Sequence, residues 1–385
     1  MLRRIVKKSI DLISSNNYLT LNNIYINSSR VLNNLAVVQK LNSKNTIIPV
    51  LKANAYGHGL IEITKILNEA DVSFIAVDGY FEAAKIRDIT NHKILVMGYI
   101  LPANMKLIDI KKCSFVIQDI DGLAALSKLD KPVNIHLELN TGMNRLGLNN
   151  SEINQFLNYI EKHTNLILEG VMTHLADADN EYDDSYTKNQ FIKFDREVEN
   201  IIKRGFKPKY IHIAQTAGSV KAISKYANAI RLGIGLYGLN PLGPKDNNFN
   251  RLNELQPVLE LRSTIIKCVE LEKGDRVSYN GIFTAPKKMR IGILPIGYYE
   301  GIPRNLSNRG FVTYKKTKQN IVGRVCMNHT MIDLTDSMAK INNEVVIISN
   351  DKTADNSVIN LCQKFDLFSY TLVTGLSNSV RRNIV

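Results

Sequence analysis

A lysine at the start of a glycine-rich loop is the feature of the sequence that most suggests chemistry. Lys52 follows a β-branched run, Tyr56 lies four residues later, and two glycines flank His58. Burial can lower the pKa of a lysine amine until the amine acts as a nucleophile and forms a Schiff base. A phenol beside an amine in a tight loop suits an aldehyde cofactor that carries a phosphate. The alternative for a lone lysine is a structural ion pair.

Two later segments could bind such a phosphate. Thr216, Ala217 and Gly218 follow another β-branched run, and we expect them to start a helix whose backbone amides face an anion. Gly233 follows Arg231 in the next run and allows the backbone to approach a ligand closely. A single glycine would indicate only a turn, but the two segments together favour a phosphate site.

Eight strand-like runs are available to position these residues. They span residues 46–52, 74–79, 93–99, 114–119, 133–140, 166–175, 210–215 and 229–237. Helical patterns lie between several of them, at residues 60–69, 81–88, 153–163 and 187–204. Strands that alternate with helices form parallel sheets, and eight repeats match a closed (β/α)8 barrel of the TIM type, so the predicted fold class is α/β.

Active-site residues of such barrels follow the carboxyl ends of the strands. This rule selects seven candidate residues, which are Lys52, Glu138, Arg145, His174, His212, Thr216 and Arg231. For either histidine alone, the alternative is a satisfied histidine in the core.

The pattern changes after Tyr237. Residues 238–257 are rich in Gly, Pro and Asn, which indicates a linker, and β-branched runs separated by turn residues follow. We therefore expect a cofactor-binding barrel at residues 1–242 and a mostly β domain at residues 243–385. An early strand at about residues 20–27 could pack with either domain.

Composition excludes several classes of protein. The 385 residues are 44% hydrophobic and 22% charged, which is typical of a globular chain, and no apolar run reaches the roughly 18–20 residues of a membrane helix. The net charge is 49 − 36 = +13, but the basic residues are dispersed and lack interleaved aromatics, so we expect a solvated surface and no nucleic-acid partner.

The cysteines and the N-terminus indicate a cytoplasmic protein. The four cysteines are far apart and form no CxxC pair, so neither a disulfide framework nor a metal cluster is expected. Free thiols suit a reducing compartment. The N-terminus has a basic start but no apolar segment of signal-peptide length, so we expect it to be unprocessed.

Eight motifs, in order from about residue 20 to the C-terminus, resemble those of bacterial alanine racemases, which are pyridoxal phosphate (PLP) enzymes of fold type III. The first resembles the PLP-lysine signature of that family. The motifs are LKANAYGHG, TGMNRLG, GVMTHLADAD, HIAQTAG, AIRLGIGLYG, RVSYNG, LPIGYYEG and IVGRVCMN. A match across both expected domains is far more specific than any one motif.

The resemblance implies a cofactor site. Lys52 would hold PLP covalently as an internal aldimine. Arg231 would face the pyridine nitrogen and keep it unprotonated, because a guanidinium does not readily give up a proton. His174 would pack against the cofactor ring, and His212 would orient Arg231. The residues implied at the phosphate are Tyr56, Thr216, Gly233 and Ile234.

The resemblance also implies two bases, one for each face of the substrate Cα. Lys52 would be one base, and Tyr279, supplied by the partner subunit of a head-to-tail homodimer, would be the other. Arg145 and the backbone amide of Met327 would hold the carboxylate of a small amino-acid substrate. Tyr298 and Tyr370 would narrow the entrance, with Tyr370 beside the cofactor.

The sequence departs from the family pattern in four places. Many members have a lysine at the position of Glu138, modified to a carbamate that pairs with the equivalent of Arg145. Here we expect the Glu138 carboxylate to supply that charge directly. The other departures are Asn328 in place of Asp, Gln215 in place of Asn, and the pair Tyr299-Glu300 in place of a small residue and Asp.

The leading hypothesis is therefore an alanine racemase that interconverts L- and D-alanine and supplies D-alanine for peptidoglycan. A broad-specificity amino-acid racemase on the same fold is the main alternative. A decarboxylase would profit from a protonated pyridine, which the Arg231 position disfavours. A PLP-binding carrier would resemble the barrel alone, and no motif supports a nucleic-acid-binding module.

Overall fold

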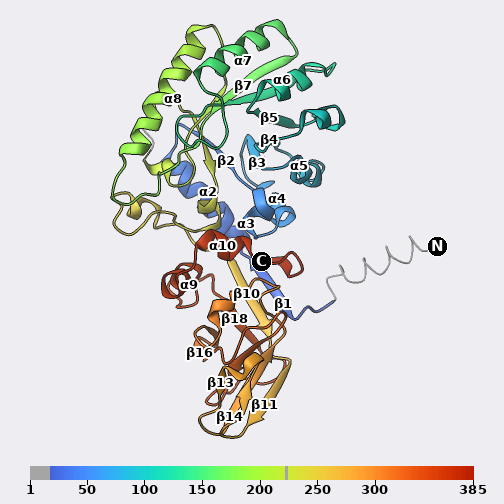
Figure 1. The fold of residues 1–385 in the computed structure, drawn as a ribbon, viewed down its shortest axis with the longest axis vertical. Helices are drawn as coiled ribbons and strands as arrows, with labels where there is room; N and C mark the ends of the chain where they lie inside the picture. Colours follow the sequence, from blue (N-terminus) through green and yellow to red (C-terminus); the bar gives the residue numbers. More distant parts are fainter. Residues whose placement is uncertain (1–17, 222–223) are drawn as a thin grey trace, which may run out of the picture. The chain divides into compact units, whose positions relative to one another are not determined.

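The chain folds into two compact units (Figure 1). The computed structural model describes residues 18–221 and 224–385. One unit, the barrel unit, consists of Asn27–Val258. The other, the β unit, combines the segment that ends at Ile26 with Leu259–Val385. The barrel unit is thus inserted into the sequence of the β unit.

Eight parallel strands form the sheet of the barrel unit. Its spatial order is β2-β9-β8-β7-β6-β5-β4-β3. The ring closes where Val50 forms a single parallel bridge with Ala76, beside a hydrogen bond from Leu51 N to Ala76 O. The strands are β2 (Thr46–Pro49), β3 (Phe74–Val77), β4 (Lys93–Val96), β5 (Cys113–Ile117), β6 (Val133–Glu138), β7 (Leu166–Met172), β8 (Tyr210–His212) and β9 (Ala229–Leu232). The predicted eight-stranded α/β barrel is confirmed.

Amphipathic helices connect these strands. In α8 (Ser185–Lys203), for example, Phe191, Phe194, Val198 and Ile201 are buried on one face. The other helices are α2 (Ser28–Leu41), α3 (Lys52–Tyr56), α4 (Leu60–Leu67), α5 (Tyr80–Ile86), α6 (Ile120–Ser127) and α7 (Asn150–Lys162). Short 3₁₀ segments lie at η1 (Pro102–Leu107), η2 (Gly218–Val220), η3 (Ile234–Tyr237) and η4 (Phe249–Leu252).

One predicted helix is absent from the described residues. We expected Thr216–Gly218 to start a helix, but only the 3₁₀ turn η2 forms there. The hydroxyl of Ser219 donates to Thr216 O at 2.6 Å and closes this turn.

The barrel interior is apolar for most of its depth. Alternate residues of the strands point inward and form one buried cluster, which includes Ile48, Val50, Phe74, Ala76, Leu95, Val116, Met172, Tyr210 and Ala229. Tyr56 and Met97 pack against this cluster from the carboxyl ends of the strands. The polar residues that share the interior are described below with the site.

The boundary between the units falls at Val258, later than the residue 242 expected from composition. The segment after η3 lacks regular strands, yet it is fastened to α2 by the fully buried Asn34. The Asn34 amide donates to Leu236 O at 3.1 Å and Gln256 O at 2.9 Å, and its oxygen accepts from Gln256 N at 2.9 Å. The two ends of the barrel unit also meet, because Asn27 N donates to Val258 O at 3.1 Å.

We predict that Asn34→Ala lowers the free energy of unfolding by about 2–3 kcal/mol, because it removes three hydrogen bonds and leaves the buried Leu236 carbonyl without its Asn34 partner. Urea unfolding measures the change. The exposed Asn104→Ala serves as the control and should shift stability by less than about 0.5 kcal/mol. Equal effects of the two substitutions would contradict the role given to Asn34.

The β unit contains two sheets and a hairpin. Its six-stranded sheet has the order β16-β15-β18-β10-β1-β19, and its three-stranded sheet has the order β11-β14-β17. The strands are β1 (Asn22–Ile26), β10 (Leu259–Thr264), β11 (Lys267–Leu271), β12 (Arg276–Val277), β13 (Phe283–Thr284), β14 (Met289–Leu294), β15 (Phe311–Tyr314), β16 (Thr317–Asn320), β17 (Thr330–Asp333), β18 (Glu344–Ile348) and β19 (Arg381–Ile384). The early strand β1 pairs with β10 and β19, so it is part of this unit.

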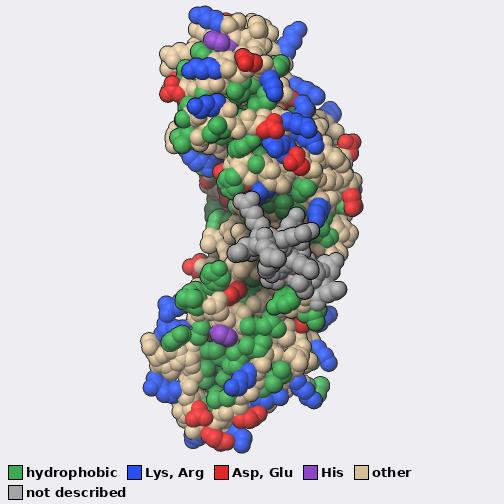
Figure 2. All heavy atoms as spheres, turned by 90° about the vertical axis from the view of Figure 1, so that its right-hand side faces the viewer, with side chains coloured by type: hydrophobic (Ala, Val, Ile, Leu, Met, Phe, Trp, Pro, Cys, Tyr) green, Lys and Arg blue, Asp and Glu red, His purple; other side chains and the backbone are tan. Residues whose placement is uncertain are grey.

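Short helical segments complete the β unit. They are α9 (Val358–Phe365), α10 (Ser369–Thr374) and the 3₁₀ turns η5 (Tyr279–Gly281) and η6 (Arg304–Leu306). Hydrophobic side chains gather on one face of this unit (Figure 2). No helix in the described part of the chain is long and apolar enough to cross a membrane.

Candidate active site

The loop that carries Lys52 is a left-handed helical turn. Ala53, Asn54, Ala55 and Tyr56 have φ angles of 55°, 55°, 52° and 52°. Each non-glycine residue in this conformation costs roughly 1–2 kcal/mol, because Cβ crowds the backbone. Four in succession therefore store strain beside a lysine at the end of a barrel strand. Strain of this kind persists only where the surroundings impose it.

Side chains of the same loop hold part of this turn. Asn54 Oδ1 accepts from Leu60 N at 2.8 Å at the start of α4. The buried His58 ring donates from Nδ1 to the carbonyls of Ala55 and Tyr56, at 3.1 and 2.9 Å. The same ring stacks on Tyr237 of η3, with 4.3 Å between ring centroids. The two glycines thus flank a histidine that is packed in the core.

The amine of Lys52 forms no ion pair within the described residues, so the structural ion pair considered from the sequence is not present. The side chain is half-buried. Its positive charge nonetheless reaches two expected site residues. It opposes the rise that burial causes in the pKa of Glu138, and it adds to the lowering of the pKa of His174 by burial and the Arg231 charge. Lys52, Glu138 and His174 therefore share one electrostatic environment.

Arg231 is the centre of the buried polar network. Its side chain is in the barrel interior and is 3% exposed. Nη1 donates to His212 Nδ1 and His212 O, both at 2.9 Å. Nη2 donates to Thr173 O at 2.7 Å, His174 Nδ1 at 3.2 Å and Ile213 O at 3.2 Å. All five bonds use the two terminal nitrogens, and none uses Nε.

Burial and the Arg231 charge fix the protonation states around it. Burial lowers the pKa of Arg231 to about 10, so the guanidinium stays charged at neutral pH. Burial and the nearby Arg231 charge lower the pKa of His174 to about 3 and that of His212 well below its usual value. Both imidazoles are therefore neutral acceptors for the guanidinium.

A chain of hydrogen bonds continues from Arg231 through the barrel interior. His212 Nε2 lies 2.8 Å from His136 Nδ1, and His136 Nε2 lies 3.4 Å from Glu169 Oε2. Because arginine only donates and a carboxylate only accepts, each imidazole must accept at Nδ1 and donate from Nε2. Lys93 Nζ and Ser114 Oγ donate to Glu169 at 3.0 and 2.5 Å and end the chain.

The sequence analysis did not single out His136 or Glu169. Both are polar residues inside runs that otherwise read as buried strands, and this was the signal that could have identified them. Gln190 of α8 was missed as well. Its amide binds Thr141 Oγ1 at 3.1 Å, His174 O at 2.9 Å and Ala176 N at 2.8 Å, and so it fixes the loop that follows β7.

We predict that Glu169→Gln destabilises the protein by about 2–3 kcal/mol at pH 7. Burial alone would raise the pKa of Glu169, but hydrogen bonds from His136, Ser114 and Lys93 outweigh it and lower the pKa to about 2. A lowered carboxyl pKa stabilises the fold above the unfolded value of 4.5, and this contribution is lost as the pH falls towards 2.

Denaturant unfolding between pH 7 and pH 3 measures the effect. The difference in the free energy of unfolding between the wild type and Glu169→Gln should become smaller below pH 4.5. The exposed Glu254→Gln is the control and should follow the wild type throughout. A gap that does not change with pH would show that the Glu169 charge contributes nothing.

Tyr56, Thr216 and two glycines form a cradle beside the Lys52 turn. A Cβ on Gly233 would lie 2.7 Å from Tyr56 Oη, and one on Gly235 would lie 2.6 Å from Thr216 Cγ2. Only glycine therefore allows these hydroxyl groups their positions. Thr216 Oγ1 accepts from Gly235 N at 3.1 Å, which leaves its own proton free for a ligand.

Burial raises the pKa of Tyr56 to about 12, so its phenol is a protonated donor. Ile234, the first residue of η3, is buried next to Gly233. The structure thus brings Tyr56, Thr216 and Gly233 together at the end of the barrel where Lys52 lies.

The direct pair expected between Glu138 and Arg145 is absent from the described residues. Glu138 is buried at the end of β6, whereas Arg145 lies on the exposed loop that follows. Burial raises the pKa of Glu138, and the charge of Arg231 opposes this more strongly than that of Arg145. A glutamate side chain is shorter than a carbamylated lysine, and the Glu138 carboxylate does not reach the guanidinium of Arg145.

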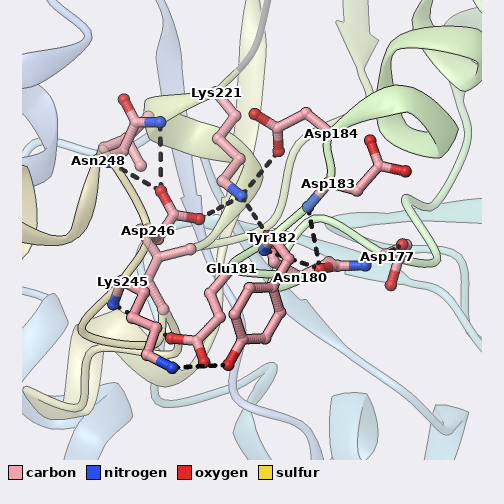
Figure 3. A network of polar contacts seen from close by, with 12 residues as sticks. Asp177, Asn180, Glu181, Tyr182, Asp183, Asp184, Lys221, Lys245, Asp246 and Asn248 are labelled. Atoms are coloured by element: carbon pink, nitrogen blue, oxygen red, sulfur yellow. Dashed lines mark hydrogen bonds and ion pairs between the residues drawn. The ribbon is translucent and has the colours of Figure 1, made fainter.

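A buried ammonium joins three loops at the same end of the barrel (Figure 3). Lys221 Nζ donates to Asn180 O at 3.0 Å and Asp184 Oδ1 at 2.9 Å, and it also pairs with Asp246. The two carboxylates outweigh the effect of burial and raise the pKa of Lys221. The loops that follow β7, β8 and β9 are therefore held together around one charge.

Within the β unit, Tyr279 lies on a rigid, exposed turn. Its neighbours Ser278 and Asn280 have φ angles of 65° and 61°, and Tyr279 itself is 67% exposed. Ser278 Oγ donates to Arg324 O at 2.8 Å, and Arg276 Nη2 donates to Asn280 O at 2.6 Å. These bonds present the phenol to solvent on a strained but anchored backbone.

Cys326 connects this turn to the other expected residues of the β unit. Its sulfur lies 3.4 Å from Ser278 Oγ, and its carbonyl accepts from Tyr298 N at 3.0 Å. Met327 follows Cys326 and is exposed, as is Tyr298. Tyr279, Tyr298 and Met327 are thus linked through one cysteine. Tyr370 lies on α10, where its ring stacks on Phe368.

Two departures from the family pattern bind one another. Asn328 Nδ2 donates to Glu300 Oε1 at 2.7 Å, and Gly297 N donates to Glu300 Oε2 at 2.7 Å. The family pattern has an aspartate at position 328. Here the amide of Asn328 binds the carboxylate of Glu300, whose side chain is longer than the aspartate usual at position 300. The third departure, Gln215, accepts from Gly218 N at 3.1 Å and caps η2.

No group of three or more His, Cys, Asp or Glu side chains in residues 18–221 and 224–385 is arranged to hold a metal ion. The barrel instead collects a lysine, a buried arginine and a hydroxyl-lined cradle at the carboxyl ends of its strands. These features are those of an α/β-barrel protein with a candidate active site at the carboxyl ends of its strands.

Comparison with known proteins identifies the family. A model of the alanine racemase N-terminal domain matches residues 26–241, and one of the alanine racemase C-terminal domain matches residues 258–384. The alanine racemase of Halothermothrix orenii is 33% identical over 352 residues, which cover 90% of this chain and 92% of that protein. That of Staphylococcus saprophyticus is 31% identical over 369 residues, 93% of each chain.

Solved structures agree. An alanine racemase of Clostridium difficile 630 has a TM-score of 0.88 and 26% identity over 96% of this chain and 97% of that one. The alanine racemase of Bacillus anthracis, solved with bound L-Ala-P, has a TM-score of 0.86 and 27% identity over 96% of each chain. The chain belongs to the alanine racemase family and is an enzyme of the isomerase class.

Proposed function

We propose that this enzyme interconverts L- and D-alanine with PLP held by Lys52. The observation that carries the proposal is the barrel-end arrangement of Lys52, the buried Arg231 and the Tyr56–Thr216 cradle. The bound L-Ala-P of the Bacillus anthracis relative supports a small amino-acid substrate. The proposal includes a cytoplasmic location and the supply of D-alanine for peptidoglycan.

The residues of the barrel fit PLP. The cradle offers two hydroxyl donors, from Tyr56 and Thr216, at a place where any side chain on Gly233 would collide with the Tyr56 hydroxyl. A phosphate accepts hydrogen bonds, and two hydroxyl groups are suitable donors for it. Arg231 commits its terminal nitrogens to protein acceptors, which leaves Nε–H as the donor for a pyridine nitrogen.

Bound PLP supplies an electron sink that makes the Cα proton of an amino acid acidic. Arg231 limits the strength of that sink, because a guanidinium donates a hydrogen bond but does not hand its proton to the pyridine nitrogen. The neutral His212 and His174 accept from Arg231 and keep it oriented. Arg231 would thereby favour return of the proton to Cα over side reactions such as transamination.

Racemisation requires a base on each face of Cα. Lys52 Nζ removes or returns the proton on one face. On the other face the phenol oxygen of Tyr279, from the partner subunit of a homodimer, does the same. The exposed and anchored turn of Tyr279 supports this role, since a phenol presented to solvent is available to a second copy of the chain.

The substrate carboxylate is held by Arg145 and by the backbone amide of Met327. The exposure of both residues supports this assignment, because each is free to meet a ligand. Asn328 and Glu300 hold the backbone next to Met327 in place. Tyr298 and Tyr370 narrow the entrance and so favour a substrate as small as alanine.

The first test follows the chirality of L-alanine incubated with the purified protein. We expect racemisation together with a yellow chromophore that borohydride reduces onto Lys52. Lys52→Ala should abolish both, whereas Lys65→Ala on the exposed face of α4 should retain both. Covalent cofactor on another lysine in Lys52→Ala would overturn the assignment.

The second test concerns Tyr279→Phe. We expect kcat/KM for racemisation to fall by about 10²–10⁴, the usual contribution of a general base. Uptake of solvent deuterium at Cα should persist for the enantiomer whose proton faces Lys52 and should be lost for the other. Tyr299→Phe, a neighbouring exposed tyrosine, is the control and should change neither rate.

Subunit exchange tests the shared site. Mixed dimers of Lys52→Ala and Tyr279→Phe chains contain one site with both native bases, so partial activity should return. For Tyr279→Phe alone, an equal and mild loss of deuterium uptake for both enantiomers would show that Tyr279 is not a base. An absence of complementation despite proven subunit exchange would place both bases in one chain.

A further inference from the structure

Glu82 joins the loop that carries Lys52 to the loop that follows β3. Its side chain is buried, and both carboxylate oxygens accept backbone hydrogen bonds. Oε1 accepts from Ala53 N at 2.9 Å, and Oε2 accepts from Asp78 N at 2.9 Å and Gly79 N at 3.3 Å. The bond from Gly79 is an ordinary contact at the start of a helix, since Glu82 is the third residue of α5. The bond from Ala53 is different, because it leaves the helix and reaches a neighbouring loop.

The hydrogen bond at Ala53 acts directly on Lys52. The N–H of Ala53 belongs to the peptide group that begins at the Lys52 carbonyl, and that group is planar. Fixing the direction of this N–H therefore fixes the plane through Lys52 Cα and limits where its side chain can point. Ala53 is also the first of the four residues with positive φ, so Glu82 holds the strained turn at its start.

The position of Glu82 on the barrel adds a second reason for this bond. β2 and β9 pair through four residues each, whereas β2 meets β3 through the single bridge of Val50 and Ala76. The seam between β2 and β3 is thus held by few backbone contacts. Glu82 spans this seam just beyond the bridge, with Ala53 on one side and Asp78 and Gly79 on the other.

We propose that Glu82 is a positioning residue for Lys52, which it orients by holding the left-handed turn through the amide of Ala53. This inference rests on the proposed role of Lys52 in holding the cofactor. A carboxylate suits the task because it only accepts hydrogen bonds and has two oxygens for three N–H donors. A glutamine in its place has one acceptor oxygen, and its NH₂ group would face a donor.

The chain provides a matched control in Glu152. It is also the third residue of a helix, α7, and its Oε2 accepts from Asn149 N at 2.9 Å at the helix start. It has no bond to a second loop among the hydrogen bonds of the described residues. Substitution of Glu152 therefore removes the helix-start contact alone, and substitution of Glu82 removes that contact and the clamp on Ala53.

Amide hydrogen exchange of the purified full-length protein tests the clamp without reference to activity. We expect the Ala53 amide to exchange at least about tenfold faster in Glu82→Ala, because a hydrogen bond to a charged acceptor is lost. Glu152→Ala should leave Ala53 unchanged while it accelerates the Asn149 amide. If Glu82→Ala does not fold, the isosteric Glu82→Gln should still accelerate exchange at Ala53 or Asp78.

The holoenzyme gives the second readout. In Glu82→Gln we expect the visible absorption band of the lysine-bound cofactor to titrate at a different pH, because the environment of the Lys52 nitrogen changes with its orientation. We also expect kcat for alanine to fall about tenfold, with KM within about twofold of the wild type. Glu152→Gln should match the wild type in both respects.

Three results would overturn the inference. The first is wild-type exchange of Ala53 in Glu82→Ala, or of both Ala53 and Asp78 in Glu82→Gln. The second is equal acceleration of Ala53 in the Glu82 and Glu152 variants, which would show general loosening. The third is an unchanged cofactor titration in Glu82→Gln. A failure of the proposed function is distinguishable, since it would place the cofactor on another lysine while the exchange result at Ala53 stood.

Discussion

The buried charge of Arg231 is the interaction on which the barrel unit depends. A guanidinium inside an apolar barrel is costly unless its donors are satisfied, and here three backbone carbonyls and two neutral imidazoles accept from its two terminal nitrogens. This requirement explains why the ends of β7, β8 and β9 converge and why His174 and His212 stay neutral. It also explains the hydrogen-bond chain that runs on to Glu169. His212 accepts at Nδ1 and therefore donates from Nε2 to His136, which in turn donates from Nε2 to Glu169.

The sequence predicted the parts of the structure that follow from local patterns. Eight β-branched runs alternated with helical periodicity, so the barrel and its strand ends could be located, and with them Lys52, His174, His212 and Arg231. The His136–Glu169 contact could not be predicted, because the partners lie on different strands and their inward direction depends on a register shift between Ile135 and His136. Tertiary contacts also decided that the segment before Val258 packs with the barrel.

The left-handed turn and the departures from the family pattern show a second limit. Only Asn54 in this turn is of a residue type enriched at positive φ, so local propensity does not predict four such residues in succession, and the surroundings impose the conformation. Asn328 and Glu300 are two separate departures from the family pattern in the sequence, but in the structure their side chains form one hydrogen bond with each other. Glu138 shows the opposite case, because its carboxylate lies at the expected position but forms no pair with Arg145.

The meeting of Asn27 and Val258 gives the barrel unit the properties of a self-contained module. The chain enters and leaves the barrel at one hydrogen-bonded point, so the β unit is interrupted in sequence but not opened in space. Closing the gap between β1 and β10 with a short turn would leave an antiparallel hairpin that these strands already form. Joining Asn27 to Val258 would in turn allow circular permutation of the barrel, since domain ends that lie close together tolerate such rearrangement. The same geometry would allow this barrel to be inserted as one piece between two neighbouring strands of another β framework.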